Sequence, residues 1–167
     1  QALAALTTGG DNVAVGYNAL NDMTTANDNT AVGESSLAVC TGSDNTAMGH
    51  NSGCAVTSGT SNTLIGEYAG GSITTAPRNV CIGYQAGYNI TTDSGSGGRN
   101  ICIGDDTIVA SATNDREVVI GHNSTGKGTG TALLRGTNGV YNSENTTAWQ
   151  TTSDERIKKN IVDNNIG

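Results

Sequence analysis

Phenylalanine is missing from this chain of 167 residues, and other large aromatic residues are few, with one Trp and five Tyr. A compact domain of this length normally builds its core on such side chains. Proline occurs once, whereas glycine occurs 24 times. The core must therefore consist of Val, Ile, Ala, Leu and Cys in thin layers, which suits a solenoid better than a sphere.

Basic residues are also scarce, with 8 Lys and Arg against 15 Asp and Glu, which gives a net charge of −7. This balance argues against nucleic acid or an anionic membrane surface as a partner. No run of 18 apolar residues occurs, so we expect no membrane insertion. No signal peptide opens the chain, and we expect Gln1 to lie within a longer protein.

The chain is rich in one motif, which consists of Asn, three short apolar or β-branched residues, and Gly. Six copies begin with Asn, and the seventh begins with Glu117. The closing glycines are separated by 17, 16, 17, 17, 21 and 17 residues. Self-similarity at a short fixed period marks a solenoid. These glycines are Gly16, Gly33, Gly49, Gly66, Gly83, Gly104 and Gly121.

Each run of three residues before a glycine is too short for a helix and is typical of a strand. Side chains alternate along a strand, so the first and third residues share one face and the middle residue points to the other. The middle residues are mostly small, which indicates a tight space. We expect both faces to be buried, one on the coil's own core and one on a neighbour. The glycine allows the backbone to turn.

The sequence therefore predicts an all-β, repetitive β-solenoid or β-roll of about seven 17-residue coils over residues 11–125. At about 4.8 Å per coil, the rod is roughly 34 Å long. Such thin coils enclose little, so we expect a homotrimer. The sequence leaves open whether the coils wind within one chain or intertwine among three chains. Residues 1–10 end a preceding segment or form a linker, 126–150 form a glycine-rich transition with short strands, and 151–167 begin another motif.

The leading Asn of each coil has two compatible interpretations. Stacked side-chain amides can donate and accept hydrogen bonds along the column, as in Asn ladders of other stacked β structures. Alternatively, each Asn starts the turn into its strand, since its side chain mimics the backbone.

Few other residues suggest chemistry. His50 and His122 occupy the same slot after glycine, which holds Tyr, Glu or Asp elsewhere, so we expect a solvated corner. Glu34 and Asp105-Asp106 are candidate carboxylates by position only. The cysteines lack the CxxC spacing of zinc sites. Cys81 and Cys102 share the small middle slot in consecutive coils, as free thiols or as a disulfide. No motif indicates a cofactor, and no metal site is expected.

The segment from Thr152 to Ile161 has two interpretations. It fits a capped helix, with Ser153 as the N-cap and acidic residues in the first turn. It also fits a nucleophile, Ser153, with Lys158 as its base, because a desolvated lysine can serve this role.

The order Ser153, Asp154, Arg156 and Lys158 directly after a β-repeat resembles the entry motif of the intramolecular chaperone domain of endosialidase-type phage tailspikes and many tail fibres. The resemblance covers about ten to fifteen residues. It implies a domain that trimerises, assists fibre folding and cuts itself off. By this resemblance Ser153 is the nucleophile, Lys158 the base, and Asp154 and Arg156 the remaining motif positions. We expect cleavage only in a longer precursor, because the family's chaperone continues for about a hundred residues.

The repeats also resemble the head coils of trimeric autotransporter adhesins, which form a β-roll. Together the resemblances imply a structural and receptor-binding segment of a phage tail fibre in the virion, with a host cell-surface receptor, a glycan, and other tail proteins as partners. The alternatives are a bacterial surface adhesin and a glycan-degrading tailspike, which needs paired carboxylates. We expect no enzymatic activity from the repeats themselves.

Overall fold

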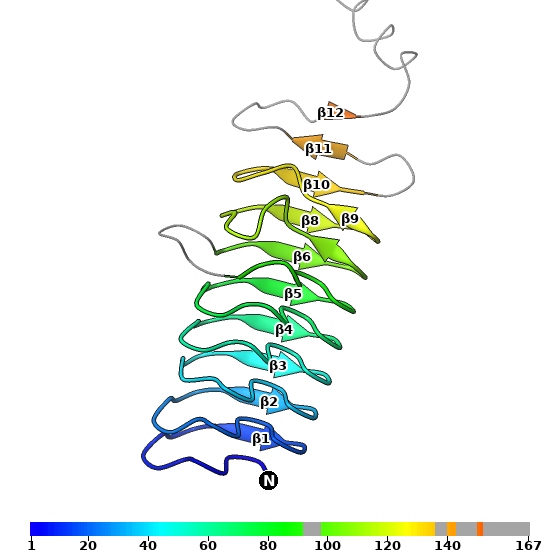
Figure 1. The fold of residues 1–167 in the computed structure, drawn as a ribbon. Helices are drawn as coiled ribbons and strands as arrows, with labels where there is room; N and C mark the ends of the chain where they lie inside the picture. Colours follow the sequence, from blue (N-terminus) through cyan, green and yellow to red (C-terminus); the bar gives the residue numbers. More distant parts are fainter. Residues whose placement is uncertain (92–97, 136–139, 143–149, 152–167) are drawn as a thin grey trace, which may run out of the picture.

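The computed structural model describes residues 1–91, 98–135, 140–142 and 150–151. Within these residues the chain forms short strands and turns and contains no helix. It winds into a narrow rod in which each coil adds one strand to a single tall sheet (Figure 1). The predicted all-β solenoid is confirmed.

The main sheet contains the seven glycine-ended strands in their chain order. Each pairs in parallel with the next, and β10 (Ala132–Leu134) continues the parallel stack beyond β8. Because consecutive strands of the same chain are neighbours, the coils wind within one chain. The seven strands are β1 (Val13–Val15), β2 (Thr30–Val32), β3 (Thr46–Met48), β4 (Thr63–Ile65), β5 (Val80–Ile82), β6 (Ile101–Ile103) and β8 (Val118–Ile120).

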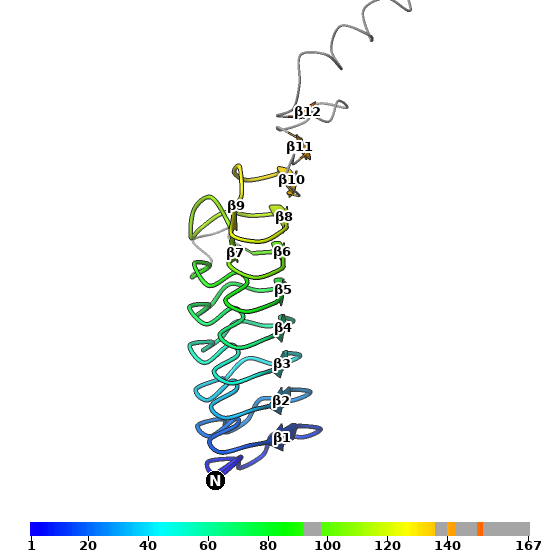
Figure 2. The same cartoon turned by 90° about the vertical axis from the view of Figure 1, so that its right-hand side faces the viewer.

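Four further strands complete the described structure. β7 (Thr107–Ile108) and β9 (Ser124–Thr125) form a small parallel sheet of their own. β11 (Val140–Asn142) and β12 (Gln150–Thr151) extend the main sheet in antiparallel pairing after β10. The main sheet forms one side of the rod, and the turns and the β7–β9 pair lie across from it (Figure 2).

The strands stack in register, so each slot of the repeat forms a column along the rod. The middle residues pair with one another, for example Leu64 with Cys81 and Cys81 with Cys102. From β2 to β8 their side chains are fully buried in the interior. The predicted tight inner face is confirmed. The step of 21 residues between Gly83 and Gly104 leaves the pairing of β5 with β6 undisturbed.

The opposite wall of the core comes from the turns, which the repeat pattern did not assign. Leu20 and Leu37 are buried there at φ of 49°. In later coils the same slot holds glycine. A Cβ on Gly53 or Gly70 would lie 2.6 Å from a methyl carbon of Leu64. The early coils thus combine a small residue on the strand with a leucine in the turn. At Leu64 the arrangement is reversed, because a large strand residue fills the core opposite a turn glycine.

The glycine that ends each strand is required by the stacking itself. At Gly49, φ is 138°, and a Cβ would lie 2.5 Å from the carbonyl oxygen of Gly66 in the next coil. A larger residue would be strained by its own backbone and would press against the neighbouring backbone. The spacing of these glycines therefore sets the coil period.

A ladder of asparagine side chains runs from the partly buried Asn12 through the interior to Asn100, and its members from Asn29 onward are buried. Asn29 donates from its backbone N and its Nδ2 to Oδ1 of Asn12, at 3.0 and 3.3 Å. The same pair of bonds recurs at every step, with Nδ2–Oδ1 distances of 3.1–3.2 Å. Asn29 also donates to the carbonyl of Asn27, two residues earlier. Both interpretations of the Asn are therefore confirmed: it forms a ladder and starts a turn.

The ladder ends at Glu117, which is fully buried. Its backbone N still donates to Oδ1 of Asn100 at 2.9 Å. Its carboxylate accepts from the Ala110 N, Asn114 Nδ2 and Gly128 N atoms at 3.0, 2.8 and 2.7 Å. Because a carboxylate only accepts, the line of donating amides stops here. The longer side chain instead binds the glycine-rich segment that leads to β10.

Asn62→Asp should strongly destabilise the rod. Nδ2 of Asn62 donates to Asn45 Oδ1 and to the Ala76 carbonyl, at 3.1 and 3.2 Å. Aspartate removes both donors and buries a charge against oxygen atoms, which should cost about 3–5 kcal/mol of unfolding free energy in urea. Burial raises the pKa of the new carboxyl, so the loss should shrink as the pH falls and the group is protonated.

The control is Asn123→Asp, the same change at an exposed asparagine. It should alter the unfolding free energy by less than about 0.5 kcal/mol. Equal effects of the two variants would show that the ladder has no special energetic role.

Candidate functional site

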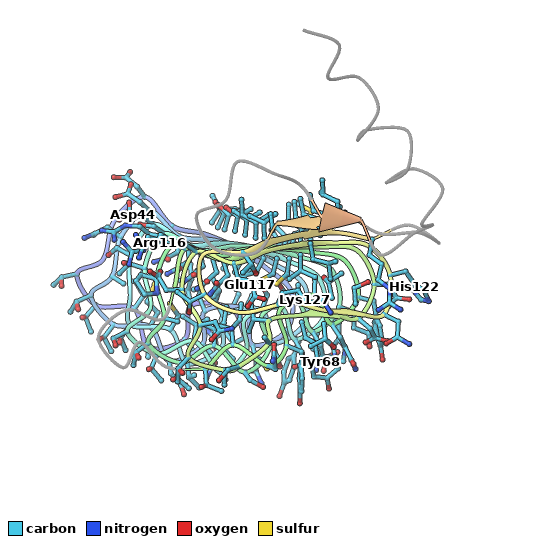
Figure 3. All side chains as sticks on the ribbon, turned by 90° about the horizontal axis from the view of Figure 1, so that it is seen from above. Asp44, Tyr68, Arg116, Glu117, His122 and Lys127 are labelled. Atoms are coloured by element: carbon cyan, nitrogen blue, oxygen red, sulfur yellow. The ribbon has the colours of Figure 1, made fainter. Side chains whose placement is uncertain are left out.

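A view along the rod shows a flattened cross-section with distinct faces (Figure 3). The main sheet forms one long side. Tyr68 projects from the side across from it, Asp44 and Arg116 lie at one edge, and His122 lies at the opposite edge (Figure 3). Since every coil repeats the same turns, each face presents columns of side chains. These columns are the candidate functional surfaces.

The outer face of the main sheet is unusually apolar for an exposed surface. Its first and third strand residues point away from the core, and they include Val13, Val15 and Met48 at 50%, 57% and 47% exposure. The third-residue column is apolar in all eight parallel strands, whereas the first-residue column contains threonine in β2, β3 and β4. We call this column the outer aliphatic column: Val15, Val32, Met48, Ile65, Ile82, Ile103, Ile120 and Leu134.

The expectation that both strand faces are buried therefore divides into two parts. The inner face is buried within the chain. On the outer face Val13 and Val15 are half or more exposed, whereas both outer residues of β2, β4, β5, β6 and β8 are of intermediate burial. Contact of the outer face with another copy stays a prediction. A continuous apolar strip along a rod is the kind of surface that marks an interaction site.

The side across from the sheet carries aromatic and polar groups. The ring of Tyr68 packs edge-to-face against His50 and Tyr88, with centroid distances of 5.7 and 6.4 Å. Tyr84 and Tyr88 are 46% and 44% exposed. Aromatic rings with polar tips are well suited to surfaces that bind a partner while staying partly wet. We call Tyr68 and Tyr88 the tyrosine face; Tyr84 lies beside it in the column that directly follows each strand-ending glycine, with His50 and His122.

Both histidines lie at the solvated corner that the sequence predicts. Nδ1 of His50 lies 3.6 Å from Glu67 Oε1, and Nδ1 of His122 lies 3.2 Å from Asp105 Oδ2. Their side chains are 47% and 75% exposed, so each pair is a surface contact with little energetic weight. In the part of the chain that the structure describes, no three His, Cys, Asp or Glu side chains cluster as metal ligands do.

The candidate carboxylates are not brought together across coils. Glu34 and Asp105 follow Gly33 and Gly104, which stand four coils apart in the stack. At 4.8 Å per coil this is about 19 Å along the rod, whereas paired glycosidase carboxylates lie about 5–9.5 Å apart. Asp105 and Asp106 are adjacent in sequence, and Asp105 faces His122 instead of a second acid.

The Ser–Lys motif lies outside the described residues. This applies to Ser153, Asp154, Arg156 and Lys158, so the autocleavage assignment stays a prediction.

All four cysteines are free thiols. Cys40 is fully buried, and this burial raises the pKa of its thiol to about 11. A hydrogen bond with the Cys102 thiol, together with burial, holds the pKa of Cys81 well above its ordinary value. Burial also raises the pKa of Cys54. Thiols in this state are poor nucleophiles and act as small apolar residues.

Comparison of the chain with protein-family models, curated proteins and solved structures finds no match. Among the described residues, no helix is long and apolar enough to cross a bilayer.

Cys40 should make the folded state sensitive to alkaline pH. Its thiol has a pKa of about 11 when folded, against 9.0 ordinarily, so the folded chain holds the proton more tightly. Its contribution to stability is complete below about pH 9 and is lost as the pH rises through 11, by up to about 2–3 kcal/mol. Urea unfolding at a series of pH values measures this loss.

Cys40→Val is the matched control, because Val56 occupies the corresponding buried slot of the next coil. Wild type should lose more stability than Cys40→Val between pH 8 and pH 11. Parallel pH profiles for the two proteins would contradict the assignment.

Proposed function

We propose that this chain is a structural and receptor-binding segment of a homotrimeric phage tail fibre. The observation that carries the proposal is the outer aliphatic column, an apolar strip that runs the whole length of a slender rod. Three rods that share an axis, parallel and in register, place these strips together along that axis. Such an assembly is closed by symmetry and supplies the burial that a single coil lacks.

The charge distribution supports an apolar interface at the sheet. Charged residues are absent from the first and third positions of all eight parallel strands. They lie instead at the edges and on the side across from the sheet, for example Asp44, Arg116 and Asp105. Removal of water from the sheet face therefore leaves no buried charge unpaired.

The receptor-binding part of the proposal rests on the tyrosine face. In the proposed trimer this face points away from the axis, on the side of the rod opposite the sheet. It combines the rings of Tyr68 and Tyr88 with the amide of Gln85, and the neighbouring column after the glycines adds Tyr84 and the carboxylates of Glu67 and Asp105. Flat apolar faces bordered by hydrogen-bonding groups suit a sugar chain, so a cell-surface glycan is the proposed receptor class.

The purified chain should be a trimer of about 50 kDa by light scattering, three times 16.8 kDa. Ile82→Glu combined with Ile103→Glu places two carboxylates in the outer aliphatic column and should yield monomers, because burying unpaired charges is unfavourable. Val39→Glu is the control, since Val39 is exposed but lies outside the sheet. A monomeric wild type would refute the trimer.

In a longer precursor that continues beyond Gly167, Ser153→Ala or Lys158→Ala should abolish release of a C-terminal fragment. Removal of either the nucleophile or its base stops attack on the peptide bond. Lys159→Ala is the neighbouring control and should be cleaved as wild type is. Gel electrophoresis of the expressed precursor measures the outcome, and continued cleavage of both dyad variants would exclude the Ser–Lys assignment.

A further inference from the structure

One edge of the rod carries a column of residues that directly precede the ladder residues of each coil. All seven side chains are exposed, and all seven residues have left-handed φ values of 54–64°. Asp44 and Arg116 mark this edge in Figure 3. We call it the charged edge column: Asp11, Asp28, Asp44, Ser61, Arg78, Arg99 and Arg116.

Backbone hydrogen bonds hold this column in register. The N–H of Asp44 donates to the Asn27 carbonyl at 3.2 Å, and the N–H of Arg78 donates to the Thr60 carbonyl at 2.9 Å. The remaining steps between coils have the equivalent bond, in which the N–H of the column residue donates to the carbonyl of the residue that precedes the column in the coil before. Successive side chains of the column are therefore spaced by one coil, about 4.8 Å along the rod.

The charges along this column are segregated. Three aspartates occupy the first three coils, Ser61 occupies the fourth, and three arginines occupy the last three. The first coils of the rod carry only acidic charges, because the first Lys or Arg in the sequence is Arg78. Stacking like charges one coil apart is unfavourable within a chain, whereas alternation of Asp and Arg would be favourable. Contacts between neighbours in the column therefore do not favour this order, although Arg99 and Arg116 also pair with the buried Asp115 of the same chain.

Backbone conformation does not account for the arginines either. The left-handed region favours Gly, Asn and Asp, so aspartate suits the slot and arginine does not. Yet Arg78, Arg99 and Arg116 occupy it at φ of 58°, 59° and 54°. What distinguishes these residues from the better-suited alternatives is a positive charge on a long side chain.

Two of the arginines are held in place by a buried carboxylate of the same chain. The carboxylate of Asp115 is 2% exposed and accepts from Arg99 Nε and Nη2 at 2.9 Å each. It also accepts from Arg116 Nε at 2.8 Å. The guanidinium groups themselves stay at the surface, with side chains 45% and 66% exposed. Including Asp115, the arginine half carries a charge of 3 − 1 = +2, against −3 for the aspartate half. Fixed side chains lose less entropy when a partner binds.

We propose that the charged edge column is a contact surface for a second copy of this chain, which lies antiparallel to the first. A two-fold axis through Ser61 places Asp44 opposite the partner's Arg78, Asp28 opposite the partner's Arg99, and Asp11 opposite the partner's Arg116. The contact is isologous, so each pair occurs twice. In a parallel, in-register contact at this edge, like charges would face one another.

This association is separate from the trimer proposed above. It uses an edge of the rod and not the outer aliphatic column, so it can join two single chains or two trimers side by side. The attraction between the two copies is electrostatic, and the charged side chains that produce it are exposed to solvent. It should therefore be strong at low ionic strength, where the Debye length is about 30 Å at 0.01 M, and weak at 1 M, where it is about 3 Å.

The test is sedimentation equilibrium of the full chain in 10 mM and 500 mM salt. The mass at high salt reports the trimer proposal, and an increase of that mass at low salt reports this one, so each can fail alone. Single chains should double in mass, whereas trimers, which carry three edge columns each, should form assemblies of two or more trimers. Asp44→Arg or Arg78→Asp should weaken the low-salt association at least tenfold, since each places like charges opposite one another. The double variant Asp44→Arg with Arg78→Asp should restore it to within about threefold.

Asp44 and Arg78 suit this swap because the arginine partners of Asp115 are Arg99 and Arg116, and because the column already accepts both Asp and Arg. Glu34→Arg is the control, with the same charge change at an exposed site away from this edge. It should associate as wild type does. Absence of a salt-dependent increase in the mass of the folded chain would overturn the proposal. Failure of the double variant to restore association would also overturn it and would assign the charges to a different partner.

Orientation is tested by cross-linking with a short bismaleimide in a Cys54→Ser background, where the other cysteines are buried. Ser61→Cys lies near the two-fold axis and should cross-link at low salt and not at high salt. Asp11→Cys should not cross-link, because six coils of about 4.8 Å separate the two copies of this residue. Equal cross-linking of both positions would show a parallel contact and exclude the antiparallel one.

Discussion

The asparagine ladder is the interaction on which the rest of the rod depends. A coil of 17 residues has few apolar side chains, so burial alone does not hold its backbone at one height above the next. Each ladder amide joins its own strand, the preceding coil and a turn carbonyl through bonds such as Asn62 Nδ2 to Asn45 Oδ1 and to Ala76 O. A single bond of this kind contributes about 0.5–1.5 kcal/mol net, whereas a buried amide left unpaired costs more. The ladder therefore enforces register mainly by making every slipped arrangement unfavourable.

Given that register, the core is a set of short columns whose volumes are balanced across the rod. Leu37 fills the interior from the turn side, and Leu64 fills it from the sheet side over Gly53. No single coil determines this balance, because the side chain of Leu64 packs against the turns at both Gly53 and Gly70, which belong to adjacent coils. Packing is thus shared between adjacent coils, as in other solenoids, where stability is the sum of repeats and their interfaces.

The repeat pattern predicted the strands, their glycine ends and the asparagine column because each is written locally in every copy, as in Asn79 to Gly83. It did not predict the turn leucines, since Leu20 adopts a left-handed φ of 49° that a leucine rarely takes. It also did not predict the grouping of Arg99, Asp115 and Arg116, which unites residues 16 or 17 positions apart. Alignment of the copies slot by slot is the signal that reveals such contacts, because residues one period apart become neighbours. The same alignment shows Glu117 in an asparagine slot, where it ends the ladder.

The outward columns are freed from the demands of the core, so their composition reports what each surface does. The outer aliphatic column is uniform over eight strands, as an interface needs when it extends along an axis. The column after each glycine is mixed, with Tyr84, Asp105 and His122 in successive coils, which gives each height of the rod a different chemical character. The charged edge column is neither uniform nor mixed but ordered, from acid to base. An ordered column distinguishes the two ends of the rod, and the proposed antiparallel contact depends on that distinction. In a stack whose coils are otherwise alike, this order is what gives the edge a direction.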